Sequence, residues 1–484
     1  MDDFIRIIDD DFDEEVEFLR KLIRCNSERT EPVTAQDGTV YPFGQGVEDA
    51  YQLVMSEGER MGFATCDADH YGGHVEYGNG SRVMGILAHL DVVPAGDGWS
   101  FEPYSGVVDG GYIYGRGTTD DKGPLVASLF AMRALKKAGY EPSARVRLVL
   151  GLDEETEWTG MERYIQDVGP CDYGFTPDAD FPVVNGEKGI LTFDLVRKLQ
   201  DRKLNGLELT QLSGGAAHNM VAEKAYAVIN ASDPALYGTV KDKLFRYKTT
   251  HAVINGFEPK ISVRGIGRSL KISVEGKSAH GAHPQLGLNA VSVLMEILGL
   301  FSFASEEVND VISFYNDNIG FDPDGERLGC AFRDDVSGML TLNVGVVAYV
   351  RKSITFTINV RYPINRTADD VYRAIARVTD RYGIGTVRKS QQEPIYFDPE
   401  SRMIKTFMET YQEFTGDTES KPETIGGGTY ARSMKNIVAF GALFPGDPDL
   451  MHQRDERLEL DHLKTATKIY AQTIYKLTQE GFEF

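Results

Sequence analysis

Two stretches of largely apolar residues predict buried strands early in the chain. The first starts at Val83 and closes with His89-Leu90-Asp91, and the second covers Arg145–Leu152. Such runs are typical of strands covered on both faces of a parallel sheet. Between them, 125–138 has helical spacing, with Pro124 suited to a first turn and Gly139 to a C-terminal cap. Strand, glycine-rich loop, helix and strand together predict a βαβ unit of an α/β protein.

The two ends of the chain have helical patterns that fit the α/β domain, whereas the middle of the chain has a different pattern. A helix is predicted over about 13–24, and further helices over 400–414 and 458–477. The middle of the chain instead alternates apolar and polar positions, which predicts antiparallel strands over 190–198, 207–212, 270–274 and 354–360. We therefore expect an α/β domain in two pieces, 1–187 and 394–484, interrupted by an inserted α+β domain over 188–393.

Size and charge narrow the class of protein. At 484 residues the chain exceeds one comfortable hydrophobic core, which agrees with two domains. Its 42% hydrophobic and 26% charged residues are ordinary for a globular protein. The net charge of −22 argues against nucleic acid or an anionic membrane as a partner.

Cysteine usage and the start of the chain indicate the compartment. The acidic first residues lack a basic segment followed by an apolar one, so no signal peptide is expected. No apolar stretch reaches the length of a membrane span. The four cysteines are scattered without CxxC spacing, which favours reduced thiols in a cytoplasmic protein over a zinc knuckle or disulfide framework.

Polar side chains follow both predicted parallel strands. His89 and Asp91 are two apart, so they point to the same side and could hold a divalent metal. The triplet Asp153-Glu154-Glu155 closes the second strand, where adjacent carboxylates repel one another unless a cation lies among them. A solvated acidic loop is the alternative for this triplet. Asp178 and His452 add two more residues of ligand type in loops.

Together with the string Gly-Arg-Gly-Thr-Thr-Asp-Asp-Lys-Gly at 115–123, these residues occur in the order seen in di-zinc aminoacylase/carboxypeptidase-type peptidases, which the chain resembles. The closer resemblance is to the peptidase V branch, the dipeptidases that include Xaa-His dipeptidase. It is carried by segments 177–182, 185–189, 426–432 and 443–446, and it covers nearly the whole chain. The resemblance implies a catalytic domain with a mixed sheet flanked by helices, and an inserted α+β lid domain.

The resemblance also implies a metal centre. Its ligands would be His89, Asp120, Glu155, Asp178 and His452, with Asp120 bridging two Zn²⁺ ions per chain; Co²⁺ or Mn²⁺ would also suit this donor set. Two such metals share a water and lower its pKa toward roughly 7.

Further catalytic roles are implied in the same way. Glu154 would be the general base and Asp91 the partner that fixes the tautomer of His89. Spacing alone does not order Glu154 and Glu155, and Asp91 could instead be a turn residue. The peptide bond between Asp120 and Asp121 matches a place where the family uses a cis bond.

In the inserted domain, the resemblance implies that His280 stabilises the oxyanion and that Asn219 and Arg361 bind substrate or intermediate. Arg is apt because its guanidinium grips a carboxylate through two hydrogen bonds. Gly427, within Gly426–Gly428, would let backbone approach the substrate, unless this is simply a tight loop.

The segments 207–218 and 270–280 resemble each other. By comparison with dimeric relatives, this similarity suggests two lid halves joined in one chain and a protein that is active as a monomer; chance similarity is the alternative.

The expected function is hydrolysis of dipeptides or short peptides in the cytoplasm, by a metal-bridged water with Glu154 as base. The alternatives are an N-acyl amino-acid amidohydrolase or a carboxypeptidase of the same superfamily, and a metal-stabilised binding protein without turnover.

Overall fold

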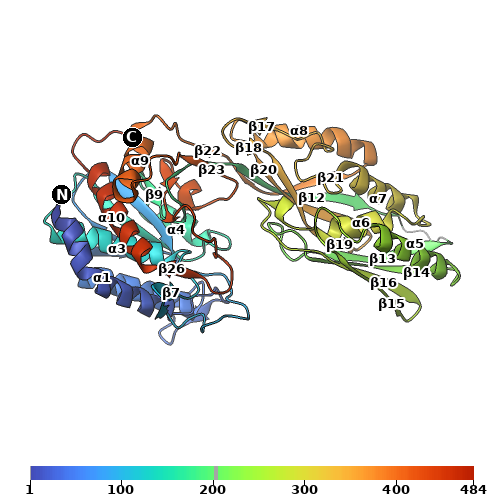
Figure 1. Ribbon diagram of the computed structural model, residues 1–484, viewed down its shortest axis with the longest axis horizontal. Helices are drawn as coiled ribbons and strands as arrows, with labels where there is room; N and C mark the ends of the chain where they lie inside the picture. The colour runs from blue at the N-terminus through green and yellow to red at the C-terminus, as the bar shows by residue number, and fades with distance from the viewer. Residues whose placement is uncertain (1, 201–204) are drawn as a thin grey trace. The chain divides into compact units, whose positions relative to one another are not determined.

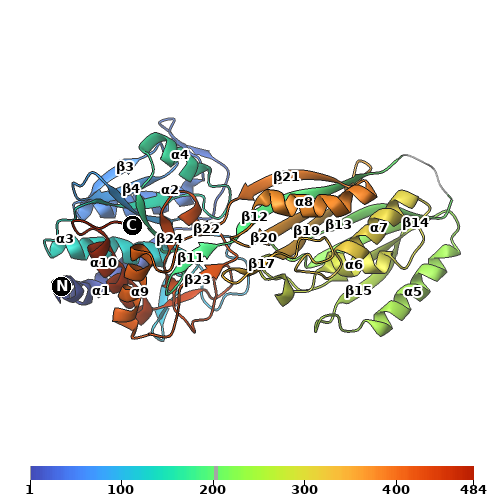
Figure 2. The same cartoon turned by 90° about the horizontal axis from the view of Figure 1, so that it is seen from above.

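The computed structural model describes residues 2–200 and 205–484, and the chain divides into two compact units. The first comprises the chain up to Gly186 together with Tyr396–Thr424 and Gly428–Phe484. The second comprises Glu187–Ile395 and Ile425–Gly427. Figures 1 and 2 show the elements of each unit.

A mixed sheet forms the centre of the first unit. Its strands, in spatial order, are β22 (Ile395–Tyr396), β11 (Val184–Glu187), β24 (Ile437–Ala439), β9 (Tyr173–Thr176), β5 (Val83–His89), β8 (Arg145–Gly151), β4 (Gly73–Tyr77) and β3 (Ala64–Asp67), with β23 (Glu423–Ile425) paired to β11. β5 is parallel to β8 and β9, and β9 is parallel to β24. The carboxyl ends of these four strands therefore meet at one edge.

Helices and short strands surround this sheet. The helices are α1 (Asp2–Ile23), α2 (Gln45–Arg60), α3 (Lys122–Lys137), α4 (Thr159–Val168), α9 (Arg402–Thr415) and α10 (Leu460–Leu477). The short strands are β1 (Val33–Thr34), β2 (Val40–Tyr41), β6 (Val107–Asp109), β7 (Tyr112–Tyr114), β10 (Ala179–Asp180), β25 (Ala442–Leu443) and β26 (Arg457–Glu459). Within the unit, α3 contacts α1 and α10, as the close ribbons in Figure 1 suggest.

Two helix predictions have different outcomes. The helix after the glycine-rich loop is confirmed, and Gly139 follows it at φ +76°, the left-handed conformation expected of a cap residue. The first helix begins earlier than predicted, because Phe4, Ile8 and Phe12 recur at a spacing of four and are buried.

The second unit is an antiparallel sheet with helices packed on it. The strands, in spatial order, are β15 (Lys260–Ile266), β16 (Ser269–Glu275), β14 (Lys224–Ala231), β13 (Leu207–Gly214), β19 (Thr341–Val350), β20 (Ser353–Tyr362), β12 (Gly189–Lys198) and β21 (Gly385–Gln392). Its helices are α5 (Leu236–Thr250), α6 (Ala290–Leu298), α7 (Glu306–Asn318) and α8 (Ala368–Thr379), and a separate pair is β17 (Arg333–Asp334) and β18 (Gly338–Met339).

Alternation along β16 illustrates why this sheet forms. Leu270, Ile272 and Val274 are buried, whereas the residues between them are only partly covered. One face of the strand therefore packs into the core of this unit, as the period of two predicts. The two similar segments contribute β13 and β16, which lie on either side of β14 and are both antiparallel to it.

No helix in the described ranges is both long and apolar enough to cross a membrane.

Candidate functional site

The carboxyl edge of the parallel strands gathers six side chains of ligand type. His89 ends β5, Glu154 and Glu155 follow β8, and Asp178 follows β9. Asp120 and His452 lie in the loops that precede α3 and β26, and they join the same cluster. All belong to the first unit.

Asp120 lies between the two imidazoles. Its Oδ1 is 2.9 Å from Nε2 of His89, and its Oδ2 is 2.9 Å from Nε2 of His452. His452 Nε2 also lies 3.0 Å from Oε1 of Glu155, and His89 Nε2 lies 3.7 Å from Oδ2 of Asp178. The arrangement thus has two halves that share one carboxylate.

Two overlapping sets of donors are close enough to hold an ion. In one set, ligand atoms of His89, Glu154 and Asp178 lie within 4.8 Å of one another; in the other, those of His89, Asp120 and Glu155 do. Imidazole nitrogens and carboxylate oxygens are a donor set that suits zinc and other divalent transition metals.

Asp91 supports both strand ends. Nδ1 of His89 hydrogen-bonds the backbone carbonyl of Asp91 at 2.9 Å, and the Asp91 carboxylate is 3.4 Å away. The two oxygens of that carboxylate accept hydrogen bonds from the backbone N–H groups of Glu154 and Glu155, each at 3.0 Å. The sequence suggested a contact between Asp91 and His89, but it gave no sign of the carboxylate's hold on the glutamates.

The carboxylates of this cluster oppose one another's ionisation. Burial, and then the charge of Asp120, raises the pKa of Asp178 to about 7. Burial, and then the charge of Asp178, raises the pKa of Glu154 and of Asp121 well above the usual range. Asp121 is buried, and within the described residues its Oδ1 has no hydrogen-bond partner.

The imidazoles of His89 and His452 compensate part of this charge. Burial alone would lower the pKa of His452, but hydrogen bonds to Asp120 and Glu155 raise it to about 11. For Asp120 the effects are reversed. Burial alone would raise the pKa of its carboxyl, but hydrogen bonds from His452 and His89 hold that pKa below its usual value. Divalent cations would relieve the remaining repulsion, so these residues fit a metal centre.

Two features of the glycine-rich loop bear on this centre. The peptide bond between Asp120 and Asp121 is cis, as the resemblance suggested. Arg116 and Glu456 form a buried ion pair beneath the loop, with Nη1 and Oε2 2.6 Å apart. Sequence reasoning gave neither of these two residues a role, although Arg116 lies inside the quoted string.

A third group of ligand-type residues is formed by Asp447, Glu459 and His462. Nδ1 of His462 is 2.9 Å from Oδ2 of Asp447, and its ring packs against Phe444. All three are partly exposed, and none of them is among the residues predicted for the metal centre.

The predicted residues of the second unit meet in two places. Met220 pairs with His280, and the backbone N–H of Gly281 donates to the carbonyl of Asn219 at 2.6 Å, so Asn219 and His280 lie together. Arg361, on β20, donates to the carbonyl of Gly426, next to Gly427, at 3.0 Å.

Two paired asparagines support these places. Asn343 on β19 lies opposite Asn359 on β20. Asn343 Nδ2 donates to the carbonyls of His218 and Met220 at 3.1 and 2.8 Å, and Asn359 Oδ1 accepts from Arg361 Nε at 2.9 Å. One face of the two strands thus carries both contacts.

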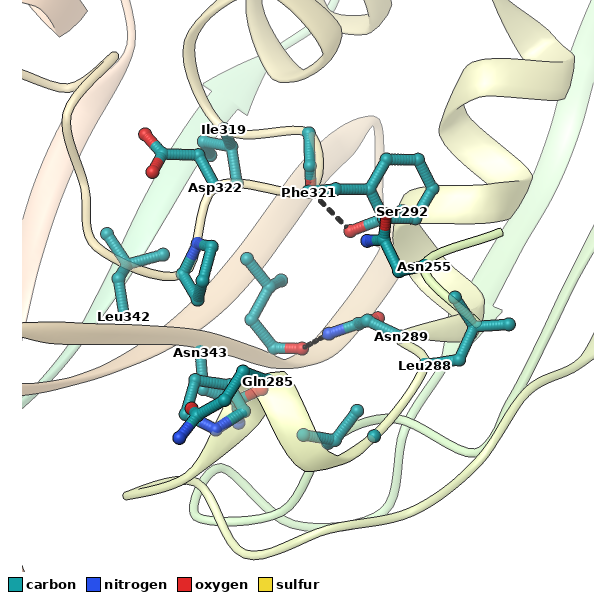
Figure 3. Close-up of a pocket in the computed structure, with 16 residues that line it drawn as sticks. Asn255, Gln285, Leu288, Asn289, Ser292, Ile319, Phe321, Asp322, Leu342 and Asn343 are labelled. Atoms are coloured by element: carbon teal, nitrogen blue, oxygen red, sulfur yellow. Dashed lines mark hydrogen bonds between the residues drawn. The ribbon is translucent and has the colours of Figure 1, made fainter. Parts of the chain in front are cut away.

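A cavity of about 260 Å³ lies in the second unit, partly lined by Asn343 (Figure 3). Its wall includes Asn289, whose Nδ2 donates to the carbonyl of Val344 at 2.8 Å, and Ser292, whose hydroxyl donates to the carbonyl of Gly320 at 2.6 Å. The lining contains no Lys, Arg or His among the described residues. The side chains that line the cavity therefore offer an anionic group no positively charged partner.

Comparison with known proteins gives the chain a family likeness over most of its length. Residues 85–476 match the sequence model described as Peptidase family M20/M25/M40. A Staphylococcus haemolyticus protein named "Putative dipeptidase" is 35% identical over 476 residues, which cover 96% of this chain and 97% of the relative. A Staphylococcus epidermidis protein of the same name is 36% identical with the same coverage.

Solved structures share the fold at low identity. A dipeptidase from Saccharomyces cerevisiae superposes with a TM-score of 0.57 at 14% identity, and human carnosine dipeptidase 1 with 0.55 at 16%; each comparison covers 99% of both chains. Aminoacylhistidine dipeptidase from Vibrio alginolyticus gives 0.54 at 16% identity, covering 95% of this chain and 96% of that structure.

Proposed function

The chain belongs to peptidase family M20/M25/M40 and is a metallopeptidase, and from this premise we propose that it is a di-zinc dipeptidase of the peptidase V type. The observation that carries the proposal is the position of Asp120, with one carboxylate oxygen on each of two imidazoles. The dipeptidase names of the relatives support the substrate class, and so do the segments that resemble the peptidase V branch.

In this proposal the first ion is held by His89, Asp120 and Asp178, and the second by Asp120, Glu155 and His452. Zn²⁺ suits these donors, and Co²⁺ or Mn²⁺ could replace it. Bound divalent ions would supply Lewis-acid stabilisation and an activated water.

Glu154 is proposed as the proton carrier. It takes a proton from the attacking water and later delivers it to the amine that leaves. Burial favours this use, because it raises the pKa of the Glu154 carboxyl and so makes it a better proton acceptor than an exposed Glu. Asp91 is a positioning residue for this step, since it binds the backbone on which Glu154 is carried.

For the second unit we propose substrate-binding roles. Arg361 and Asn219 bind the free α-carboxylate of the substrate, and Gly427 presents backbone to it. His280 donates to the oxygen on which charge develops during attack. The contact between Arg361 and the carbonyl of Gly426 supports a shared role for these segments.

A panel of small substrates tests the substrate class. Free dipeptides should be hydrolysed, whereas their N-acetylated forms and their C-terminal amides should react at least about 10-fold more slowly, because each lacks a charge that the site recognises. Faster reaction of the N-acetylated form would favour an N-acyl amino-acid amidohydrolase. Equal rates on dipeptides and on longer peptides would favour a carboxypeptidase.

We further propose that the protein acts in the cytoplasm as a monomer on small peptides, with neither nucleic acid nor membrane as partner. The four cysteines are all free, which is typical of a reducing compartment, and the net charge of −22 would repel anionic surfaces.

A further inference from the structure

A fully buried carboxylate lies behind the glycine-rich loop. Glu456 Oε1 accepts hydrogen bonds from the backbone N–H groups of Gly117, Thr119 and Asp120 at 3.1, 2.9 and 3.3 Å. Its Oε2 accepts from Gly117 at 3.1 Å and from Arg116 Nη1 at 2.6 Å. One carboxylate therefore holds the backbone that leads into, and includes, Asp120.

Arg116 extends this contact to another loop. Its Nη1 donates to the carbonyl of Gln453 at 3.2 Å and its Nη2 to the carbonyl of Pro94 at 3.4 Å, while the guanidinium lies 5.2 Å from the ring of Trp99. The segment with Pro94 and Trp99 follows His89-Leu90-Asp91 in the chain, and Gln453 follows His452 directly. The ion pair thus connects the loop that contains Asp120, the loop that contains His452 and the loop that follows His89.

This pair differs from an ordinary structural ion pair because the carboxylate oxygens of Glu456 also accept hydrogen bonds from the backbone of the glycine-rich loop. Convergent backbone N–H groups form an anion-binding nest, and here the anion is part of the protein itself. Glu456 lies four residues after His452, and its carboxylate binds the backbone of Asp120. The position of one imidazole is therefore mechanically linked to the carboxylate that it contacts at 2.9 Å.

We propose that Glu456, charge-paired with Arg116, is a positioning residue that sets Asp120 against His452 and so determines how tightly the centre binds metal. The inference rests on the proposed metal centre, but it does not depend on which peptide is hydrolysed. Groups that orient metal ligands without touching the metal change affinity by about 10–100-fold when removed.

The test is a Co²⁺ titration of metal-free protein, followed by visible absorption, beside thermal unfolding in the presence of a chelator. Glu456→Gln should bind Co²⁺ roughly 10–100-fold more weakly and also unfold at a lower temperature, because Arg116 is left buried without its counter-charge. The double variant Glu456→Gln/Arg116→Met should recover much of the lost Tm but not the lost Co²⁺ affinity.

Glu76→Gln is the matched control. Glu76 pairs with the buried Arg147 at 2.8 Å in the same unit, and neither residue belongs to the ligand cluster. This variant should lower Tm and leave Co²⁺ affinity unchanged. Unaltered affinity in Glu456→Gln, or recovered affinity in the double variant, would overturn the positioning role while leaving the dipeptidase proposal intact. Failure of the unmodified protein to bind Co²⁺ would overturn both.

Discussion

Glu154 and Glu155 are neighbours in the chain, but their side chains meet different partners. Oε1 of Glu155 lies 3.0 Å from His452, whereas Glu154 shares a donor group with His89 and Asp178. Asp91 accepts hydrogen bonds from both backbone N–H groups and so fixes the turn from which the two side chains diverge. The proposed division of roles between a base and a ligand requires such a divergence of the two side chains.

Glu154→Gln should separate chemistry from metal binding. The amide keeps the size of the side chain but cannot accept the proton, so kcat should fall by roughly 10²–10⁴-fold while metal content stays at its original value. Glu155→Gln should instead lose metal. Steady-state kinetics and atomic absorption on both variants check this, and a wild-type kcat in Glu154→Gln would show that another group is the base.

The sequence indicated the candidate ligands because their type and place at strand ends are local features. Asp120, Asp178 and His452 needed the family resemblance, since a lone Asp or His in a loop carries little information. The role of Glu456 could be predicted neither from local sequence nor from the resemblance, because its side-chain partner Arg116 lies 340 residues earlier and only the folded chain brings the two together.

The elements follow the same division between local and long-range information. β5 and β8 could be predicted because they are largely apolar runs, and the structure buries them on both faces. α3 could be predicted because Pro124 and Gly139 mark its first turn and its end. The start of α1 was missed because three consecutive aspartates, Asp9–Asp11, separate the buried Ile8 and Phe12 and obscure the apolar face of the helix. The order of strands in the second unit depends on pairings such as β12 with β20, which no local pattern encodes.

Where α1 packs on α10, Glu15 makes stability depend on pH. It is buried and accepts a hydrogen bond from the hydroxyl of Thr467 at 2.6 Å. Burial raises the pKa of Glu15 to about 8, and the hydrogen bond only partly opposes this. The folded protein thus keeps a proton that the unfolded chain releases near pH 4.5, so stability falls as pH rises from about 4.5 to 8 and then levels off.

Glu15→Gln should remove that dependence. Relative to wild type, the variant should gain stability as pH rises from 5 to 9, by on the order of 3–5 kcal/mol at the upper end. Denaturation with chelator present at both pH values measures this. Glu17→Gln, on the exposed side of the same helix, should show the same small difference at pH 5 and pH 9. A pH-independent effect of Glu15→Gln would contradict the buried-proton account.

In the second unit, Asn343→Leu tests whether β19 supports the segment with Asn219 and His280. The variant loses both hydrogen bonds to the backbone at 218 and 220, so kcat should fall by roughly 10–100-fold through misplacement of the donor. Metal affinity should not change, because the ligands belong to the first unit. An unchanged kcat in a folded variant would show that Asn343 does not support the segment with Asn219 and His280.

At the scale of the whole molecule, the proposed catalytic and binding roles fall on residues of both units. If the similar segments containing β13 and β16 are two halves of a duplicated lid, His280 serves the metal centre of its own chain. Mixing Glu154→Ala with His280→Ala protein should then restore no activity, because neither chain is complete. Substantial recovery on mixing would mean that His280 is supplied by another chain.

Peptide hydrolysis is expected to depend on divalent metal held by the cluster around Asp120. The most direct measurement is the turnover of one free dipeptide by chelator-stripped protein, before and after stepwise addition of Zn²⁺. We expect no turnover without metal and full activity at about two equivalents of zinc per chain, in line with a carboxylate shared between two imidazoles. Full turnover by the metal-free protein would contradict the account.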